Sequence, residues 1–466
     1  MEEIISGSIL NTIKYKVLRE LAKLQWQGID PFRGFDTIAN AVCPKDAPPI
    51  RCCIYKDRAV VAERIRIGLG EFHGSKDTVQ VVSIACDECS KSGYIITDMC
   101  RGCVAHNCKE ACPRKAIYID EKRYAHINKD DCVECGRCAS ACKYGAITNL
   151  VRPCERVCPT GAISMAPTGE AHIDHSKCIV CGKCVHECPF GATNDISQVI
   201  ELIDVIKEHN KKIYAIVAPA VAAQFPEAAT GQVYAGLKKL GFDEIVEVAQ
   251  GADLTALAEA EELIEKGFIT SSCCPAFVEY INVEFPELNR HVSDTPSPMI
   301  ITAKMIREKD PDAEIVFIGP CIAKKWERKN ERGAEIVDKV LTFFELNALF
   351  DSKDIDISAL EAETVTGASS FGRGFAQSSG VAAAIKQALI ELGHGDFDFR
   401  PVVCSGIEEC KAALRKAKAG KLDGNFIEGM ACEGGCVFGN GNLINKKNPG
   451  LQMKKYMEES EKKTLK

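Results

Sequence analysis

The chain has 466 residues, 58 basic and 65 acidic, with a formal net charge of −7, and this length suits about three domains. The acidic balance disfavours nucleic acid as a partner, because phosphate binding needs a clustered basic surface. The longest strongly apolar run, residues 213–223, is too short to cross a bilayer, and the first residues lack the pattern of a secretory signal. We therefore expect a cytoplasmic protein without a membrane span.

Cysteine is the unusual component, with 26 residues. A secreted scaffold held by that many disulfides would normally be a short chain with a signal peptide. In a reducing compartment, dense cysteine indicates thiolates that bind metal. We expect the cysteines to decide the function.

Residues 1–80 are predicted to form a small, mostly helical region. The segments 13–24 and 59–70 have the apolar periodicity of amphipathic helices. Cys43, Cys52 and Cys53 lack the spacing of a cluster site. We expect core or surface cysteines there, with an extra metal site as the alternative.

Residues 81–199 contain sixteen cysteines in a repeated pattern. The run C-x2-C-x2-C-x3-C begins at Cys132 and again at Cys178, 46 residues later, and a C-x3-C-P segment precedes each run at the same offset, from Cys108 and from Cys154. This is the pattern of a bacterial two-cluster ferredoxin that lacks only its leading C-x2-C pair. The repeat predicts two α+β ferredoxin-like domains.

Two C-x2-C pairs remain, starting at Cys86 and at Cys100. The nearer pair completes the first unit and leaves the farther pair for the second. The inner domain, about residues 95–150, is then inserted into an outer domain of about residues 81–94 and 151–199, which requires its ends to lie close together.

Four [4Fe–4S] clusters follow from this arrangement, because the fourth cysteine of each run ligates the other cluster. The four ligand sets are Cys100, Cys103, Cys108 and Cys142; Cys112, Cys132, Cys135 and Cys138; Cys86, Cys89, Cys154 and Cys188; and Cys158, Cys178, Cys181 and Cys184. Structural zinc is the alternative, although zinc sites usually consist of two separated pairs. Clusters in series, without a substrate pocket of their own, conduct electrons.

Residues 200–466 have an α/β pattern. Apolar strand-like runs (212–221, 267–272, 313–319 and 425–431) alternate with helical stretches (254–267 and 380–392). The remaining cysteine groups follow three of these strands, at Cys273 and Cys274, at Cys321, and at Cys432 and Cys436. An α/β sheet normally builds its site at the carboxyl ends of its strands. We predict a further metal site there. A Cys–His hydrolase is disfavoured because no histidine signature accompanies the cysteines.

Three segments, residues 270–275, 319–327 and 430–436, resemble the three signature motifs of FeFe-hydrogenases in order and in loop context. The resemblance covers about residues 210–445. It implies a two-lobed α/β catalytic domain with an H-cluster between the lobes, and reversible conversion of protons and electrons to H₂. The H-cluster is a [4Fe–4S] cubane joined by one cysteine to a di-iron subcluster that carries CO, cyanide and an azadithiolate.

The resemblance also assigns roles to individual residues. It makes Cys274, Cys321, Cys432 and Cys436 the cubane ligands, with Cys436 as the bridge to the di-iron subcluster. Cys273 would exchange protons with the bridging amine, and Lys324 would hydrogen-bond a cyanide. The residues expected to line the pocket are Ala218, Pro219, Ser272 and Met430. The expected proton route runs Cys273, Glu262, Ser293, Glu259.

Several positions depart from the best-known form of the family and resemble a less studied branch. These positions are Phe277, Met299, Gly319 and Asn440. The implied partners are H₂ and protons, a ferredoxin or similar electron carrier, and maturation enzymes. Two alternatives remain open: a hydrogen sensor with low turnover, and a hydrogenase-like iron–sulfur assembly protein that lacks the di-iron subcluster. Cys404 and Cys410 are expected to be structural.

Overall fold

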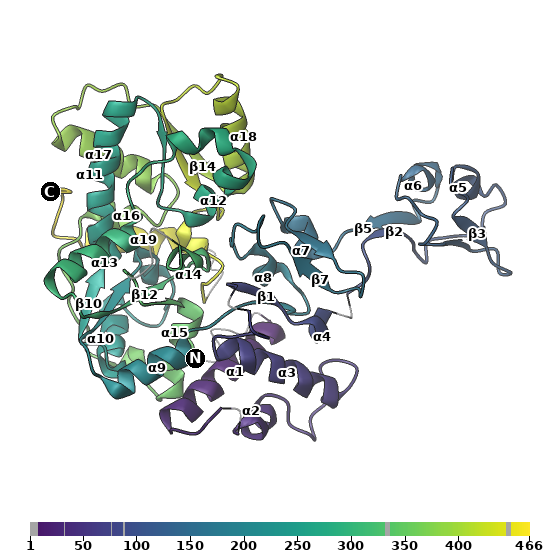
Figure 1. Ribbon diagram of the computed structural model, residues 1–466, viewed down its shortest axis with the longest axis horizontal. Coiled ribbons are helices and arrows are strands. Elements are labelled where there is room, and N and C mark those ends of the chain that lie inside the picture. The colour runs from purple at the N-terminus through teal and green to yellow at the C-terminus, as the bar shows by residue number, and fades with distance from the viewer. Residues whose placement is uncertain (1–7, 32, 76, 87–88, 331–335, 444–448) are drawn as a thin grey trace.

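The computed structural model describes residues 8–31, 33–75, 77–86, 89–330, 336–443 and 449–466. A large α/β body lies beside a helical N-terminal region, and a cysteine-rich arm extends away from both (Figure 1). This arrangement confirms the predicted fold class of an α/β catalytic region with small α+β ferredoxin-like units and a helical N-terminus. No helix among the described residues is long and apolar enough to span a bilayer.

The N-terminal region consists of α1 (Ile9–Trp26), α2 (Phe35–Val42) and α3 (Ile54–Gly68), so helices at 13–24 and 59–70 are confirmed. The apolar face of α1 packs against α9 (Val199–Glu208) and α15 (Phe343–Ser352). A hydrogen bond also joins α1 to α15: the side-chain amide of Asn347 donates to the buried Tyr15 hydroxyl at 2.9 Å. The N-terminal helices therefore share a hydrophobic core with the α/β body.

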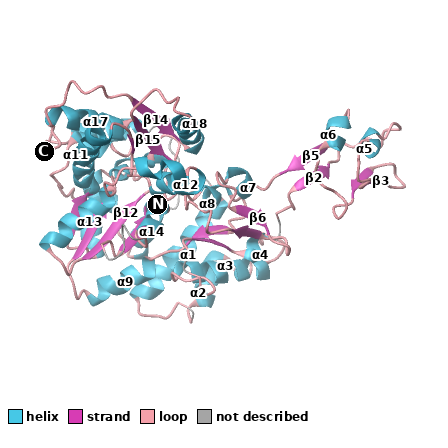
Figure 2. Ribbon diagram, turned by 45° about the horizontal axis from the view of Figure 1, so that its top comes forward, coloured by secondary structure: helices cyan, strands magenta, loops and turns pink. Residues whose placement is uncertain are grey.

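Two short antiparallel pairs organise the cysteine-rich segment. Strand β1 (Val79–Val81) pairs with β8 (Thr193–Asp195), and β2 (Gly93–Ile96) pairs with β5 (Ile147–Leu150). The second pair brings together the two chain ends of the arm, which is connected to the rest of the molecule through this ribbon (Figure 2). Close ends are what the insertion of one ferredoxin-like unit into another requires.

Each ferredoxin-like unit contains one antiparallel hairpin, β3 (Ile117–Ile119) with β4 (Ala125–Ile127) and β6 (Ile163–Met165) with β7 (Ala171–Ile173). Short helices carry many of the cysteines; these are α4 (Ser83–Cys86), α5 (Asn107–Glu110), α6 (Arg137–Ala141), α7 (Pro153–Val157) and α8 (Lys183–Glu187). With so few residues in regular structure, these units have only small hydrophobic clusters of their own, in which cysteines take part.

The α/β body contains two parallel sheets, which form its two lobes. The first has the order β10-β9-β12-β13 and the second β11-β15-β14. The strands are β9 (Ile213–Val217), β10 (Glu244–Glu247), β11 (Ile269–Thr270), β12 (Glu314–Gly319), β13 (Lys339–Thr342), β14 (Pro401–Ser405) and β15 (Phe426–Met430). The run 212–221 was expected to be a strand throughout, but it becomes the 3-10 turn η2 (Pro219–Ala223) after Val217. Proline lacks the N–H that would continue the sheet.

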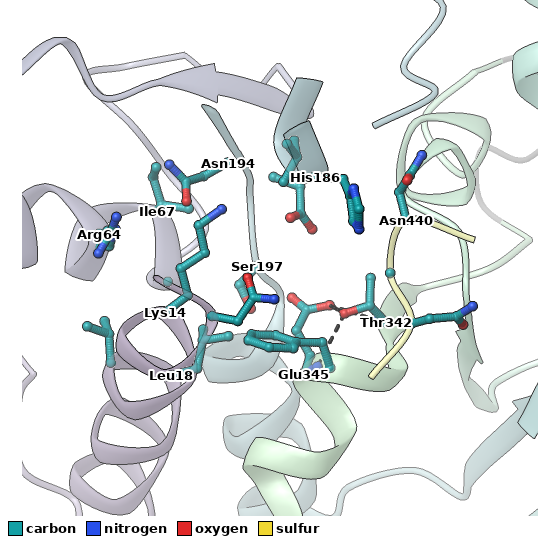
Figure 3. Close-up of a pocket in the computed structure, with 18 residues that line it drawn as sticks. Lys14, Leu18, Arg64, Ile67, His186, Asn194, Ser197, Thr342, Glu345 and Asn440 are labelled. Carbon is teal, nitrogen blue, oxygen red and sulfur yellow. Dashed lines mark hydrogen bonds between the residues drawn. The ribbon is translucent and has the colours of Figure 1, made fainter. Parts of the chain in front are cut away.

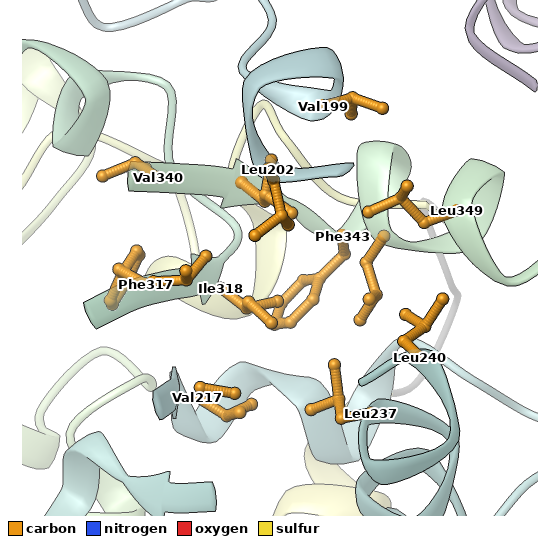
Figure 4. Packing of buried hydrophobic residues seen from close by; sticks show 14 of the residues in the cluster. Val199, Leu202, Val217, Leu237, Leu240, Phe317, Ile318, Val340, Phe343 and Leu349 are labelled. Carbon is orange, nitrogen blue, oxygen red and sulfur yellow. The ribbon is translucent and has the colours of Figure 1, made fainter. Parts of the chain in front are cut away.

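Helices cover both sheets. They are α10 (Thr230–Leu240), α11 (Val248–Lys266), α12 (Pro275–Glu284), α13 (Pro298–Lys309), α14 (Ala323–Glu327), α16 (Ser370–Gly374), α17 (Gly380–Glu391), α18 (Ile407–Lys418) and α19 (Pro449–Glu458), with 3-10 turns η3 (Pro286–His291), η4 (Ile357–Ala359) and η5 (Cys436–Phe438). Side chains from α9, α10 and α15 interdigitate with those of β9, β12 and β13 (Figure 4). Every residue of β12 is buried, as expected for a central parallel strand.

Candidate functional site

A cavity of about 90 Å³ lies between the two lobes, at the carboxyl ends of strands from both sheets. Pro219 follows β9, Cys321 follows β12, and Cys273 follows β11, while Met430 ends β15. This is where the strand-end argument places a site. We call this space the interlobe cavity.

Four cysteines gather behind this cavity from three loops. Cys274, Cys321 and Cys436 line it, and Cys432 lies close enough to the other three for their charges to act on it. Burial raises the pKa of Cys321 to about 11 and that of Cys432 well above its ordinary value, and the neighbouring cysteines add to both effects. Thiols crowded together in a dry site need a metal centre to become thiolates, so this donor set fits an iron–sulfur cluster.

The local sequence explains how these loops form. Cys274 is the N-cap of α12, and Pro275 occupies its first turn, where its missing N–H costs no hydrogen bond. Gly434 and Gly435 have φ of +81° and +93°, and a Cβ on Gly435 would come within 2.7 Å of the Ala376 carbonyl oxygen. The two glycines therefore permit the tight path from Cys432 to Cys436.

Lys324 is the buried cation of the interlobe cavity. Its ammonium donates to Glu327 at 2.6 Å, to the Ser297 hydroxyl at 2.9 Å and to the Cys273 carbonyl oxygen at 3.2 Å. Burial lowers the pKa of Lys324, but the negative charge of Glu327 more than compensates and leaves the pKa above its ordinary value. The ammonium is thus charged and held in place at the cavity wall.

Two carboxylates lie between Cys273 and the surface, in an order opposite to the expected one. Glu259 is fully buried, and its Oε1 accepts the Ser272 N–H at 2.9 Å and the Ser272 hydroxyl at 3.1 Å. Glu262 accepts the Ser293 hydroxyl at 2.5 Å and pairs with the surface cation Lys266 at 2.7 Å. The expected route passed from Cys273 to Glu262 first, and this order is wrong.

The physical reason is the direction of α11. Residues three apart share a face of a helix but differ in height by almost one turn, and the end of α11 that carries Lys266 is the solvent side. Glu259 also acts most strongly, after burial, on the thiol of Cys273, whose pKa is raised well above its ordinary value. The geometric order from the cavity outward is therefore Cys273, Glu259, Ser293, Glu262.

Burial raises the pKa of Glu259 to about 7, opposed by its bonds to Ser272 and reinforced by the charge of Glu262. Burial also acts to raise the pKa of Glu262, but hydrogen bonds from Lys266 and Ser293 hold it below its ordinary value. The Glu259 Oε2 atom has no hydrogen-bond partner among the described residues. The two carboxyls therefore differ in pKa: the buried one has a pKa near 7, and the one near solvent is ionised at neutral pH.

The residues expected to line the pocket lie in two places. Ala218, Pro219 and Met430 line the interlobe cavity. Ser272 is absent from the described lining, because its hydroxyl points to Glu259 and to the Thr295 carbonyl oxygen at 2.5 Å. Sequence reasoning missed the partners of Lys324. Glu327 lies one helical turn beyond the lysine, and this spacing was the available signal.

The sixteen ferredoxin-type cysteines also gather in groups, each named here by its first cysteine. One cavity in the arm is lined by the four residues of the Cys100 site, and another by the four residues of the Cys112 site. The Cys100 site comprises Cys100, Cys103, Cys108 and Cys142, and the Cys112 site comprises Cys112, Cys132, Cys135 and Cys138. No three described His, Cys, Asp or Glu side chains lie close enough to hold a single metal ion.

In the outer ferredoxin-like unit, two further groups of cysteines are recognised because their members raise one another's pKa. At the Cys86 site (Cys86, Cys89, Cys154 and Cys188), burial raises the pKa of Cys154 to about 11, with added effects of Cys188 and Cys86. At the Cys158 site (Cys158, Cys178, Cys181 and Cys184), burial raises the pKa of Cys181 to about 12, with added effects of Cys178 and Cys158.

The Cys158 site lies against the catalytic half of the chain. The Asn440 amide donates to the Cys181 carbonyl oxygen at 2.7 Å, and Cys181 is among the groups whose charge acts on Cys432. Ile179 packs in the same hydrophobic cluster as Ala431. The segment that follows β15 is thus in contact with a predicted cluster site.

The remaining cysteines lie apart from these groups. Cys404 and Cys410 are buried in the cluster that covers the second sheet, and Cys43 is buried in the N-terminal core. Cys52 and Cys53 stand just before α3, with their sulfurs 3.9 Å apart. None belongs to the five cysteine groups described above.

Comparisons with known proteins agree with these features. Residues 211–440 match the iron only hydrogenase large subunit, C-terminal domain, and residues 99–146 and 152–192 match the 4Fe–4S dicluster domain. Iron hydrogenase 1 of Clostridium pasteurianum is 28% identical over 385 residues, which cover 70% of this chain and 66% of that protein. The periplasmic [Fe] hydrogenase large subunit of Nitratidesulfovibrio vulgaris is 29% identical, over 53% of this chain and 72% of that one.

Two further similarities differ in kind. The cytosolic Fe-S cluster assembly factor NAR1 of Kluyveromyces lactis is 35% identical over 98 residues, or 21% of each chain. A solved apo [FeFe]-hydrogenase HydA1 of Chlamydomonas reinhardtii aligns with a TM-score of 0.42 and 21% identity, over 53% of this chain and 84% of that one. The matched domains and the hydrogenase relatives make this chain an FeFe-hydrogenase-like protein with ferredoxin-like 4Fe–4S domains.

Proposed function

We propose that the chain is an active FeFe-hydrogenase, which interconverts protons, electrons and H₂ at an H-cluster. The observation that carries the proposal is the convergence of Cys274, Cys321, Cys432 and Cys436 behind a cavity between the lobes. That cavity also presents a protonatable thiol, Cys273, and a charged amine, Lys324. A site that only stored a cubane would need the four ligands and neither of these groups.

The cubane of the H-cluster would be held by the four cysteines, with Cys436 as the bridge to the di-iron subcluster. When bound, the di-iron subcluster supplies the metal chemistry of hydrogen formation and oxidation. Ala218, Pro219 and Met430 line the cavity with largely apolar surface, so the chain excludes bulk water from it. Lys324 would place a positive charge at the cavity wall, which favours an anionic cyanide there.

The proton route is assigned to this chain's own side chains. Cys273 holds or releases a proton at the cavity wall, and Glu259 is the next acceptor because burial keeps its pKa at about 7. The Ser293 hydroxyl is bonded to Glu262 at 2.5 Å, and Glu262 reaches the surface beside Lys266. A carboxyl poised near neutral pH can both accept and donate a proton.

Electrons are proposed to move along four accessory clusters. The Cys100 and Cys112 sites lie in the arm, the Cys86 site where the arm joins the body, and the Cys158 site against the loop of Cys432. The order from the arm would be the Cys100, Cys112, Cys86 and Cys158 sites. A ferredoxin or similar carrier would deliver electrons to the arm, and maturation enzymes would insert the di-iron subcluster. The cytoplasm is the compartment we propose.

Iron–sulfur assembly without hydrogen chemistry is the second candidate, because part of the chain resembles an assembly factor at 35% identity. The two functions differ in the di-iron subcluster. Infrared spectra of the protein after maturation should show bands of metal-bound CO and cyanide, and the same sample should evolve and take up H₂. A fully loaded protein that shows neither the bands nor hydrogen turnover would favour the assembly function. Bands with very low turnover would favour a sensor.

A further inference from the structure

Three cations of the N-terminal region point at one loop of the outer ferredoxin-like unit, directly after Cys188. Each donates to a backbone carbonyl oxygen: Arg51 to Phe190 at 2.9 Å, Arg64 to Gly191 at 3.3 Å, and Lys14 to Thr193 at 3.2 Å. Lys14 and Arg64 line one cavity of about 120 Å³ together with Asn194 (Figure 3). The N-terminal region thus brings positive charge to Cys188 of the Cys86 site, and Lys14 also acts on Cys184 of the Cys158 site.

Two of these cations have no described carboxylate within ion-pair distance, and Asp195 acts on Lys14 and Asp57 on Arg64 only from farther away. Arg51 pairs with Asp57 at 3.2 Å, whereas neither Lys14 nor Arg64 forms an ion pair with a described carboxylate. Arg64 is only 4% exposed, and its Nε and Nη1 atoms have no hydrogen-bond partner among the described residues. Burial lowers the pKa of Arg64 to about 10 and that of Lys14 to about 8, so both remain largely charged at neutral pH. Arg64 is thus a buried cation without an ion pair, and such a cation favours a negative group nearby.

The Cys188 sulfur is coupled to Arg64 through a single peptide group. Arg64 donates to the carbonyl of Gly191, and the N–H of the same peptide, on Ala192, donates to the Cys188 sulfur at 3.3 Å. Hydrogen bonds in such a chain polarise one another. The positive charge therefore strengthens the hydrogen bond to a sulfur that is predicted to bind a cluster.

Another buried cation, Arg152, lies beside the same site, next to its ligands Cys86 and Cys89. Arg152 is 2% exposed and donates to the carbonyl oxygens of Ser90 at 3.0 Å and Cys89 at 3.2 Å. Its Nη1 atom lies 3.9 Å from the Cys86 sulfur. Positive charge thus surrounds the Cys86 site on two sides.

Corresponding loops elsewhere in the ferredoxin-like units provide an internal comparison. Gly145, Gly161 and Gly191 each follow a predicted ligand by three residues, with φ of +61°, +63° and +62°. A Cβ placed on Gly191 would lie 2.7 Å from the Arg64 Nη2 atom, whereas one on Gly145 or Gly161 would meet no described atom within 4 Å. The loops share a backbone conformation, so the cation is a specific addition at the Cys86 site.

We propose that Lys14 and Arg64 raise the reduction potential of the cluster at the Cys86 site, so that it is the first of the four accessory clusters to accept an electron. The inference rests on the cluster assignments of the proposed function. A [4Fe–4S] cluster bound by four thiolates is anionic and becomes more negative when reduced, so nearby cations stabilise the reduced form. Because this site lies where the arm joins the body, it would hold an electron midway along the route.

The test is a redox titration followed by electron paramagnetic resonance, on the full chain expressed without maturation enzymes. A Cys154→Ser variant identifies the signal of the Cys86 site by its loss or change. In Arg64→Gln combined with Lys14→Met, we expect the equilibrium constant for reducing that cluster to fall at least about tenfold, which is about 59 mV for one electron. Arg64→Lys alone should stay closer to wild type than Arg64→Gln alone, because it keeps the charge.

Arg66→Gln is the matched control, because Arg66 lies on the same helix, is half-buried and pairs with Glu63. It should leave all four midpoints unchanged. An unchanged midpoint in the double variant, with all four clusters present by iron content, would overturn the inference and leave the proposed function intact. Fewer than four accessory clusters in wild type would instead overturn the assignments.

If the double variant fails to bind the cluster, the wild-type titration decides. The signal affected in Cys154→Ser must then be the first to appear as the potential is lowered, and any other order refutes the inference.

Discussion

Glu259 is the position at which function and stability should oppose each other most clearly. It is a fully buried carboxyl with one oxygen bonded to Ser272 and the other without a described partner. Replacing it by glutamine keeps the shape and an acceptor oxygen for the Ser272 N–H, but removes the ionisable group. We expect Glu259→Gln to inactivate the enzyme and to stabilise the fold at neutral and alkaline pH.

The size of the stability effect follows from the pKa. Burial raises the pKa of Glu259 from 4.5 to about 7. Between these two values the native chain holds a proton that the unfolded chain has released, so the free energy of unfolding falls as the pH rises. With about 1.4 kcal/mol for each pKa unit, wild type loses about 3 kcal/mol between pH 4.5 and pH 7, and little more above pH 7. The free energy of unfolding of the Glu259→Gln variant does not fall in this way, because glutamine does not titrate.

The effect on activity follows from the proton route. Loss of a positioned proton carrier typically lowers rates by about 10²- to 10⁴-fold, or about 2.7 to 5.4 kcal/mol in the barrier. H₂ evolution and uptake by Glu259→Gln, compared at equal H-cluster content from infrared spectra, measure this loss. Glu261→Gln is the control, because this neighbouring glutamate on α11 is exposed.

Thermal unfolding of both variants and wild type should be followed from pH 4.5 to pH 8.5. The gap between Glu259→Gln and wild type should open as the pH rises toward 7 and then stay constant, while Glu261→Gln follows wild type. A gap independent of pH would refute the assigned pKa. Near-normal turnover in Glu259→Gln would refute its place next to Cys273 in the proton route.

Three other outcomes are expected. Cys273→Ala should keep its iron content and its CO and cyanide bands but lose at least about 100-fold in turnover, because a methyl group cannot carry a proton; normal turnover would remove Cys273 from the route. A fully loaded chain should contain about 22 irons, and one expressed without maturation enzymes about 20, so saturation near 12 by metal analysis would contradict four accessory clusters. Cys89→Ala should disturb the spectrum of the Cys86 site alone and Cys103→Ala that of the Cys100 site alone, and loss of the same signal in both would contradict the nested arrangement.

The cysteine spacing in the sequence predicts how the accessory sites are grouped. The first three cysteines of each C-x2-C-x2-C-x3-C run lie close together along the chain, and the fourth is assigned to the neighbouring site. The structure gathers Cys100 with Cys142, and Cys86 with Cys188, in the same groups. Strand-end placement of the catalytic cysteines was equally readable, because apolar strand runs end directly before them.

The sequence could not show which of the two glutamates on α11 faces the cavity. The spacing of Glu259 and Glu262 shows that both share a face of α11, but either could face the cavity. Only the packing of the Ser272 loop against Glu259, and the exposure of Lys266 beside Glu262, determines which carboxyl is buried. The same limit explains Ser272, whose hydroxyl turns from the cavity to Glu259.

The cations around the Cys86 site could not be predicted from the sequence, for a different reason. Lys14 and Arg64 belong to ordinary amphipathic helices, and more than 120 residues of chain separate each from the carbonyl it contacts. Local sequence determines which face of such a helix is polar, since that depends on periodicity alone. Whether a polar side chain on that face meets water or a buried sulfur ligand depends on which distant element packs there, and this only the tertiary structure decided.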